Sequence, residues 1–228
     1  MDLMPLCRWL SPRILVIVIV LAFASWAFIE VADEVVEGDS AALDRAILLA
    51  LHAPAAGGSA SEAGPVRLTA LARDITALGS TPVLTLLVVF VAAFLILAGR
   101  RWYALFVLLA AAGGALASTM LKMAFGRPRP DLVPHGDSVV SASFPSGHAM
   151  LSAVVYLSLG ALLTEVVHAR ALRVYVMLVA VFLTTAVGLS RIYLGVHWPT
   201  DVLAGWMAGA AWALGCWGCA ELVKRKAG

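Results

Sequence analysis

Six long apolar segments constrain this chain more than any other feature. They lie near residues 14–32, 82–99, 102–121, 148–166, 172–190 and 200–222. A helix that spans a bilayer needs about 20 predominantly apolar residues, and helices satisfy all of their backbone polar groups inside lipid. Hydrophobic residues make up 62% of the 228 residues, against roughly 45–50% in soluble domains. The sequence therefore predicts an all-α, integral membrane bundle of six transmembrane helices, formed by residues 1–228 as a single domain.

The 16 Lys and Arg residues are divided unevenly between the two sides of such a bundle. If the N-terminus is cytoplasmic, the cytoplasmic side carries Arg8, Arg13, Arg100, Arg101, Arg170, Arg173, Lys224, Arg225 and Lys226. The opposite side carries Arg45, Arg67, Arg73, Lys122, Arg127, Arg129 and Arg191. Because short cytoplasmic loops favour Lys and Arg, we expect both termini to be cytoplasmic in a bacterial-type inner (plasma) membrane. No basic run has the length or the aromatic residues that would indicate a nucleic-acid partner.

The first apolar segment has two interpretations. Its basic flanks and the run Ala22-Phe23-Ala24 resemble a cleaved signal peptide. The apolar run nevertheless continues through Ile29, longer than a usual signal core, so an uncleaved anchor is favoured. Cys216 and Cys219 have redox-type spacing but lie inside the last apolar segment, and together with Cys7 they predict no disulfide.

Shorter elements are expected between the first two spans and at helix contacts. Residues 41–51 and 65–78 have helical apolar spacing and predict two short extracytoplasmic helices. Thr81-Pro82 predicts an N-cap followed by proline at the first helical position. Gly205 and Gly209 have the spacing that lets two helices approach closely, and contacts within one chain are favoured over dimerisation.

The first of three polar signatures follows the third apolar segment. Lys122 closes that segment, and Arg129-Pro130 lies seven residues further on. Prolines in the run 126–130 favour a stiff, non-helical turn. Arg129 can offer a planar fork to two phosphate oxygens and Lys122 a mobile point charge, although positive charge also flanks membrane helices for other reasons. Arg127 is expected to make at best a secondary contact.

The second signature, Pro145-Ser146-Gly147-His148, opens the fourth apolar segment. A helix N-terminus binds anions through its free N–H groups and its dipole. Ser146 can cap this helix and turn its hydroxyl to an anion, and Gly147 lets the backbone approach closely. His148 would stand at the mouth of that site. A Ser-Gly pair also opens helices for structural reasons alone.

The third signature joins the last two apolar segments. Ser190-Arg191 ends the fifth segment, and His197 and Asp201 lie about one helical turn apart at the start of the sixth. The Asp201 carboxylate can accept a hydrogen bond from one ring nitrogen of His197 and leave the other exposed as a nucleophile. Arg191 adds a second guanidinium for phosphate oxygens. A helix-capping His-Asp pair is the structural alternative.

All three signatures fall on the same predicted face of the membrane. The structural alternatives given for each signature do not explain why the three should lie together. Together they indicate an enzyme that acts on phosphate at a membrane surface. A metal site is the other chemistry open to His and Asp, but neither histidine has a second carboxylate beside it and the surroundings are cationic. We therefore expect no metal and no cofactor.

These residues resemble the signatures of the type 2 phosphatidic acid phosphatase superfamily, which also includes vanadium haloperoxidases. The family pattern is Lys-x6-Arg-Pro, Pro-Ser-Gly-His and Ser-Arg-x5-His-x3-Asp, and every fixed position is present between residues 122 and 201. The resemblance implies that His197 is a nucleophile that forms a phosphohistidine, with Asp201 orienting it. It also implies that His148 is the general acid. The phosphate cradle that it implies consists of Lys122, Arg129, Ser146, Gly147 and Arg191.

The expected function is that of a metal-independent membrane lipid phosphatase with an extracytoplasmic active site. Its substrate would be undecaprenyl diphosphate, phosphatidate, phosphatidylglycerol phosphate or phosphorylated lipid A, of which the first is favoured because small bacterial members often recycle that carrier. The alternatives are a phosphotransferase with the same phosphohistidine, a vanadate-holding haloperoxidase, and a non-catalytic lipid-phosphate transporter. The expected partners are the lipid substrate and the bilayer, with no obligatory protein partner.

Overall fold

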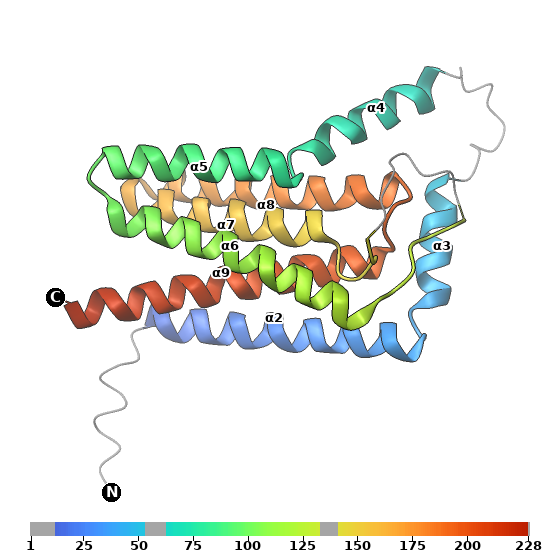
Figure 1. The fold of residues 1–228 in the computed structure, drawn as a ribbon, viewed down its shortest axis with the longest axis horizontal. Coiled ribbons are helices and arrows are strands. Elements are labelled where there is room, and N and C mark those ends of the chain that lie inside the picture. The colour runs from blue at the N-terminus through green and yellow to red at the C-terminus, as the bar shows by residue number, and fades with distance from the viewer. Residues whose placement is uncertain (1–11, 53–62, 133–140, 228) are drawn as a thin grey trace, which may run out of the picture.

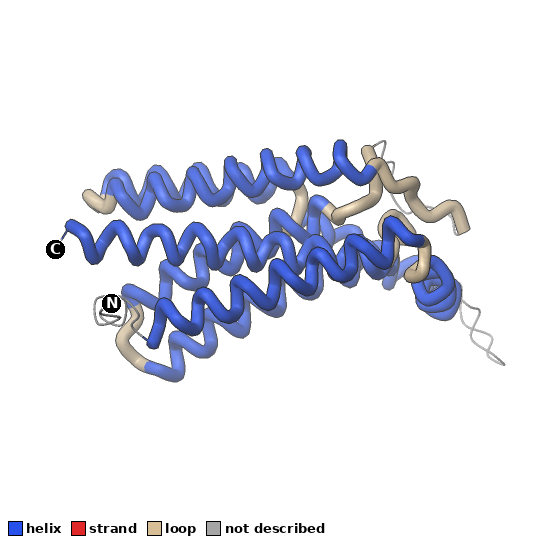
Figure 2. The backbone as a smooth tube through the Cα atoms, turned by 90° about the horizontal axis from the view of Figure 1, so that it is seen from below, coloured by secondary structure: helices blue, strands red, loops and turns tan. Residues whose placement is uncertain are grey.

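The computed structural model describes residues 12–52, 63–132 and 141–227, which form helices and loops without any strand (Figure 2). The helices are α2 (Pro12–Glu37), α3 (Ala41–His52), α4 (Ala63–Ala77), α5 (Thr81–Leu97), α6 (Arg101–Phe125), α7 (Gly147–Val166), α8 (Arg170–Tyr193) and α9 (Pro199–Ala227). Each expected apolar segment coincides with one long helix, and the two expected short helices are α3 and α4. The all-α prediction is confirmed.

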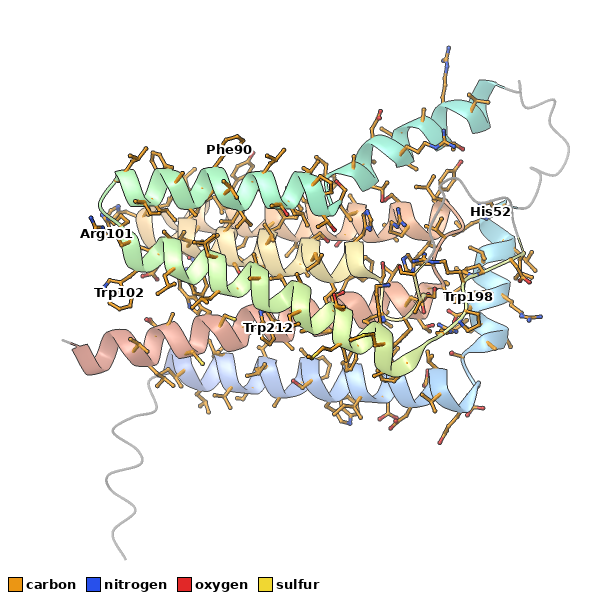
Figure 3. The ribbon with its side chains drawn as sticks, in the orientation of Figure 1. His52, Phe90, Arg101, Trp102, Trp198 and Trp212 are labelled. Atoms are coloured by element: carbon orange, nitrogen blue, oxygen red, sulfur yellow. The ribbon has the colours of Figure 1, made fainter. Side chains whose placement is uncertain are left out.

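The long helices run side by side, while α3 stands across one end of the bundle and α4 slants away from α5 (Figure 1). In the most apolar stretch of α7, 56% of the residues are buried, against 22–28% in the other four long spans. Helix α7 packs against α6, α8 and α9, and α2 packs against α9. The outer helices expose large apolar side chains, such as Phe90 on α5, which points away from the bundle (Figure 3). Such an exterior suits a hydrocarbon solvent.

Five described helices, α2, α6, α7, α8 and α9, are long and apolar enough to cross a membrane. Helix α5 has 17 residues, a length of about 26 Å at 1.5 Å per residue, short of a hydrocarbon core of about 30 Å. Helices α4 and α5 meet at a bend of 41° and together form the sixth candidate span. The six-span layout is therefore present, with one span bent.

Glycines on α9 set how closely it approaches the central helix. A Cβ atom added at Gly205 would lie 2.7 Å from the Ser146 carbonyl oxygen, and one added at Gly209 would lie 2.5 Å from the Met150 carbonyl oxygen. Real Cβ atoms do not approach other atoms so closely. The backbone of α9 at these two glycines therefore packs directly against the backbone at the start of α7. The expected contact within one chain is confirmed for these two glycines.

The ends and faces of the shorter elements differ from the sequence-based expectation. Ser80, not Thr81, is the N-cap of α5, and its side chain makes no capping hydrogen bond, so Pro82 lies one position deeper than expected. On α3 the buried residues are Asp44 and Leu48, whereas Leu43 is 60% exposed. The helix face that carries Leu43 is turned outward because the side chain of Asp44 is bound in the interior.

The cysteines in the described part of the chain are free. Cys216 is partly buried and Cys219 is exposed on α9, whereas Cys7 lies outside the described residues.

Candidate active site

The three signatures meet at one end of the bundle, on the side of α3 that faces the long helices (Figure 1). The first lies at the end of α6 and in the segment that follows it, and the second lies at the start of α7. The third spans the turn between α8 and α9. Trp198, in this turn, lies at the same end as His52 of α3, whereas Arg101 and Trp102 lie at the opposite end (Figure 3).

A cavity of about 410 Å³ opens at this end. Six of the eight residues predicted for the site line it, namely Lys122, Arg129, Gly147, His148, Arg191 and His197. Its remaining wall is formed by Gly79, Thr81, Ala115, Ser118, Thr119, Ser141 and Leu151. Ser146 and Asp201 are fully buried and do not line it. The cavity lining combines three cations and two imidazoles with small, hydroxyl and apolar side chains.

His197 is buried, with its two ring nitrogens in different surroundings. Nδ1 lies 3.4 Å from Oδ2 of Asp201 and 3.3 Å from Oγ of Ser143. Nε2 lies 3.2 Å from Nη1 of Arg129. A guanidinium can only donate, so Nε2 accepts and Nδ1 carries the hydrogen. The lone pair that a nucleophile needs is therefore on the nitrogen beside the cations.

Burial lowers the pKa of His197 to about 4, and the Asp201 carboxylate offsets only part of this effect. The imidazole is thus neutral at pH 7, which is the form that can attack an electrophile.

Asp201 is held by donors on both of its carboxylate oxygens. Oδ1 accepts from Nη1 of Arg127 at 2.7 Å. Oδ2 accepts from the backbone N–H of Trp198 at 2.9 Å and from the hydroxyl of Ser143. This set fixes the carboxylate behind His197, where it can stabilise positive charge on the ring.

The cations of the first signature are oriented by backbone carbonyl groups. Lys122 Nζ donates to Ala142 O at 2.6 Å. Arg129 donates through Nε to Ser141 O at 2.8 Å and through Nη1 to Val196 O at 2.6 Å. The expected open fork is therefore partly used within the protein, and this holds the guanidinium beside His197.

Arg191 is 1% exposed, and its Nη1 donates to Oγ1 of Thr76 at the end of α4 at 3.2 Å. It ties α4 to α8 while also lining the cavity.

The second signature shapes the cavity floor. Ser146 stands at the N-cap position of α7, but its side chain makes no capping hydrogen bond. Its hydroxyl is buried and has no hydrogen-bond partner in the described structure. A Cβ atom added at Gly147 would lie 3.4 Å from Cε of Lys122, inside the cavity wall. The absent side chain leaves that space to a ligand.

Three further residues of the site were missed by the sequence-based prediction: Asp44, Ser143 and Thr200. Arg127 was expected to be secondary, yet it binds Asp201 directly. The available signals were a carboxylate four residues before Leu48 on α3 and a second arginine in the proline-rich run. Among the described residues, no group of three or more His, Cys, Asp or Glu side chains is arranged to hold a metal ion.

Comparison with known families agrees with the predicted resemblance. Residues 102–225 match the model of the PAP2 superfamily, and they make up more than half of the chain. The chain belongs to the PAP2 superfamily.

Named relatives within this superfamily are phosphatases. The chain is 37% identical over 140 residues to phosphatidylglycerophosphatase B of Bacillus subtilis (strain 168), covering 59% of this chain and 66% of that protein. It is 35% identical over 68 residues to undecaprenyl-diphosphatase of Sulfolobus acidocaldarius, covering 30% of this chain and 29% of the relative. It is 28% identical over 122 residues to lipid A 1-phosphatase of Rhizobium johnstonii, covering 50% and 46%. The matches thus span less than two thirds of the length of each relative.

Two solved structures resemble the bundle. The transmembrane PAP2 type phosphatidylglycerolphosphate phosphatase from Bacillus subtilis superposes with a TM-score of 0.78 at 30% identity, covering 90% of this chain and 98% of that one. LpxE from Aquifex aeolicus superposes with a TM-score of 0.57 at 21% identity, covering 77% and 94%, and shows the fold alone. The PAP2 bundle described here is therefore a multi-span membrane protein.

Proposed function

We propose that this protein is a metal-independent membrane lipid phosphatase that hydrolyses a lipid phosphate or diphosphate through a phosphohistidine on His197. The observation that carries the proposal is the placement of a neutral imidazole nitrogen, Nε2 of His197, beside Arg129 in a cavity that Lys122 and Arg191 also line. A nucleophile and an anion site thus share one cavity.

In the first chemical step, the two histidines act on the two atoms of the bond that breaks, one on phosphorus and the other on the leaving oxygen. Nε2 of His197 attacks phosphorus, and the bond between phosphorus and the leaving oxygen breaks. His148, which takes up a proton when the negatively charged substrate binds, gives that proton to the leaving oxygen, which departs as the lipid alcohol or lipid monophosphate. The positive charge that develops on the His197 ring is stabilised by Asp201 through Nδ1. The product is a phosphoenzyme.

The second step returns the protein to its starting state. A water molecule attacks the phosphorus of phosphohistidine, His148 accepts a proton from it, and the bond to Nε2 breaks. Inorganic phosphate is released, with His148 again protonated. Positive charges fixed around a phosphoryl group stabilise the charge on its oxygens in both transition states.

The floor of the cavity supports anion binding. Gly147 begins α7, so N–H groups of its first turn have no acceptor within the helix. The buried Ser146 hydroxyl does not line the cavity, so the anion would be bound by these N–H groups together with the lining cations. This arrangement favours an anion over a neutral ligand.

Similarity to relatives orders the candidate substrates. Phosphatidylglycerophosphatase B is the relative matched over the largest share of the chain among those named above, and the phosphatidylglycerolphosphate phosphatase structure covers 90% of it. We therefore place phosphatidylglycerol phosphate ahead of undecaprenyl diphosphate, phosphatidate and phosphorylated lipid A. The active site is proposed to face outward, with both termini cytoplasmic.

The proposal is tested by phosphate release from purified protein in detergent containing EDTA. Phosphatidylglycerol phosphate, undecaprenyl diphosphate and phosphatidate are compared side by side, with His197→Ala as the inactive control. We expect release that persists in EDTA and disappears in the variant. Loss of lipid phosphate only after acceptor addition, with the phosphoryl group recovered on the acceptor, would show a phosphotransferase instead. Near-normal turnover by a folded His197→Ala protein would overturn the nucleophile.

A further inference from the structure

Asp44 is an unusual residue for a short helix that lies outside the membrane spans. Its carboxylate is 0% exposed and uses both oxygens. Oδ2 accepts from Nη2 of Arg127 at 2.8 Å and from Oγ1 of Thr200 at 2.6 Å. Oδ1 accepts from the backbone N–H of Thr200 at 3.0 Å. Helix α3 is thereby bound to the N-terminus of α9.

Arg127 joins this carboxylate to the one behind His197. Its Nη2 binds Asp44, and its Nη1 binds Oδ1 of Asp201 at 2.7 Å and Oγ1 of Thr200 at 2.8 Å. The guanidinium carbon lies 5.6 Å from the ring centre of Trp198, and the backbone N–H of Trp198 also donates to Asp201. The guanidinium is therefore fixed at both ends and on one face.

We propose that Asp44 is a positioning residue for the phosphatase reaction, acting through Arg127 on Asp201 and so on His197. This inference rests on the proposed function. The chain of contacts runs from Asp44 to Arg127, from Arg127 to Asp201, and from Asp201 to Nδ1 of His197. Asp44 itself does not line the cavity, so it acts without touching the substrate.

The charge of Asp44 matters because two buried carboxylates share one guanidinium. With Asp44 ionised, the positive charge of Arg127 is divided between the two aspartates. Without that charge, Arg127 faces Asp201 alone and opposes the positive charge that must develop on His197. Removing one member of a buried charge network leaves the others poorly compensated. The step that forms the phosphohistidine should slow, while the cations that bind the substrate are untouched.

The direct test is Asp44→Asn, which keeps the size of the side chain and an oxygen for the Thr200 N–H but removes the charge. We expect kcat to fall about tenfold, equivalent to about 1.4 kcal/mol of transition-state stabilisation, with KM nearly unchanged. Asp39→Asn is the matched control, since Asp39 is exposed five positions earlier, and its kcat should equal that of the wild type. Equal kcat in both variants would overturn the proposal.

A double-mutant cycle separates the route through Arg127 from a structural role at the start of α9. If Asp44 acts through Arg127, then Asp44→Asn should have little further effect in an Arg127→Gln background. If Asp44 only holds Thr200, its effect should be the same in both backgrounds and should be reproduced by Thr200→Val. Additivity of that kind would refute the relay.

Two further measurements keep the proposal open to refutation if a variant folds poorly or the wild type releases no phosphate. Arg127→Lys supplies only a point charge in place of a fork and should lower kcat in the same way as Asp44→Asn. Absence of wild-type turnover would refute the proposed function. The chain of contacts from Asp44 to His197 would then be tested by nuclear magnetic resonance. Asp44→Asn, but not Asp39→Asn, should then shift the ¹⁵N signals of His197, assigned with His197→Ala, and unchanged signals would refute the relay.

Discussion

At the scale of single residues, His197 shows how burial sets the charge and the tautomer of an imidazole. Burial takes the ring out of water and disfavours its charged form, while Asp201 and Ser143 orient it from the Nδ1 side. The ring is left neutral, with the Nε2 lone pair directed toward Arg129. The same interior contacts that hold the ring thus determine which nitrogen carries the lone pair, and in the proposed reaction that nitrogen is the nucleophile.

The lowered pKa of His197 predicts a late titration. In ¹⁵N-histidine spectra of the purified protein, His197 should keep Nδ1 protonated and Nε2 unprotonated from pH 8 to pH 5, and gain a proton near pH 4. An ordinary histidine titrates near pH 6.5. The unfolded chain binds a proton at His197 near pH 6.5, whereas the folded protein binds it only near pH 4. Protonation therefore favours the unfolded chain, and the free energy of unfolding decreases as the pH falls from about 6.5 to about 4. A midpoint at or above pH 6.5 would contradict the burial argument.

Ser143 provides a second prediction at this scale, conditional on the proposed function. Its hydroxyl donates to Asp201 and lies 3.3 Å from Nδ1 of His197, so Ser143→Ala removes one hydrogen bond to a charged group. We expect kcat to fall about tenfold, the usual effect of one such bond, with KM nearly unchanged. Ser158→Ala is the control, because the Ser158 hydroxyl is buried without a hydrogen-bond partner in the described structure and lies outside the cavity wall. Equal activity of both variants would exclude a role for Ser143.

The residues of the site divide into those that a sequence can reveal and those that it cannot. Lys122, His148 and His197 belong to short patterns with fixed spacing, and the structure places all three on one cavity. Asp44 lies 83 residues from Arg127 in the chain, so no local spacing connects them. That contact follows from where α3 lies across the end of the bundle, which is a property of tertiary packing.

At the scale of helices, the crossing of α7 and α9 sets the position of the second signature. Gly205 lies under Ser146, whose backbone N–H donates to the Asp201 carbonyl oxygen at 2.9 Å. The start of α7 and the start of α9 are therefore joined at the point where both contribute to the site. A side chain at Gly205 would force them apart.

Gly205→Ala should lower both stability and turnover. The added Cβ would lie 2.7 Å from Ser146 O and 3.0 Å from Ala149 Cβ, and the backbone atom cannot move aside cheaply. Overpacking of this kind costs about 1–3 kcal/mol, measured as a lower melting temperature in detergent. Gly215→Ala on the same helix is the control, because a Cβ there has nothing within 4 Å and alanine stabilises a helix interior by about 1 kcal/mol relative to glycine. Similar melting temperatures for both variants would contradict the close contact.

Helix positions were predictable because bilayer-length apolar runs leave the chain few alternatives. Which face of each helix is buried was harder to predict from the sequence. On α3, Leu43 is exposed and Asp44 is buried beside Leu48, so the inner face of this helix carries a charged residue as well as an apolar one. Apolar residues on such a helix can meet lipid instead of the core, so the apolar stripe alone does not identify the inner face.

At the scale of the whole molecule, the charges separate into two groups at opposite ends of the bundle. Arg100 and Arg101 lie in the turn between α5 and α6, and Arg170 and Arg173 begin α8. At the site end, Lys122, Arg127, Arg129 and Arg191 are bound to carbonyl, hydroxyl or carboxylate groups of the site. Four of the seven basic residues expected on this side therefore have a local reason to be there, and those at the opposite end can follow the preference of short cytoplasmic loops for positive charge.

This division predicts the orientation of the protein in the membrane. Single cysteines placed at Asp39, near the site end, and at Arg101, at the opposite end, are compared in a background where Cys7, Cys216 and Cys219 are replaced by serine. Both positions are exposed, so a difference in labelling reports the side of the membrane. In intact spheroplasts, a membrane-impermeant maleimide should label Asp39→Cys at once and Arg101→Cys only after permeabilisation. The reverse pattern would place the cavity in the cytoplasm, and the phosphatase would then have to draw its lipid from the inner leaflet.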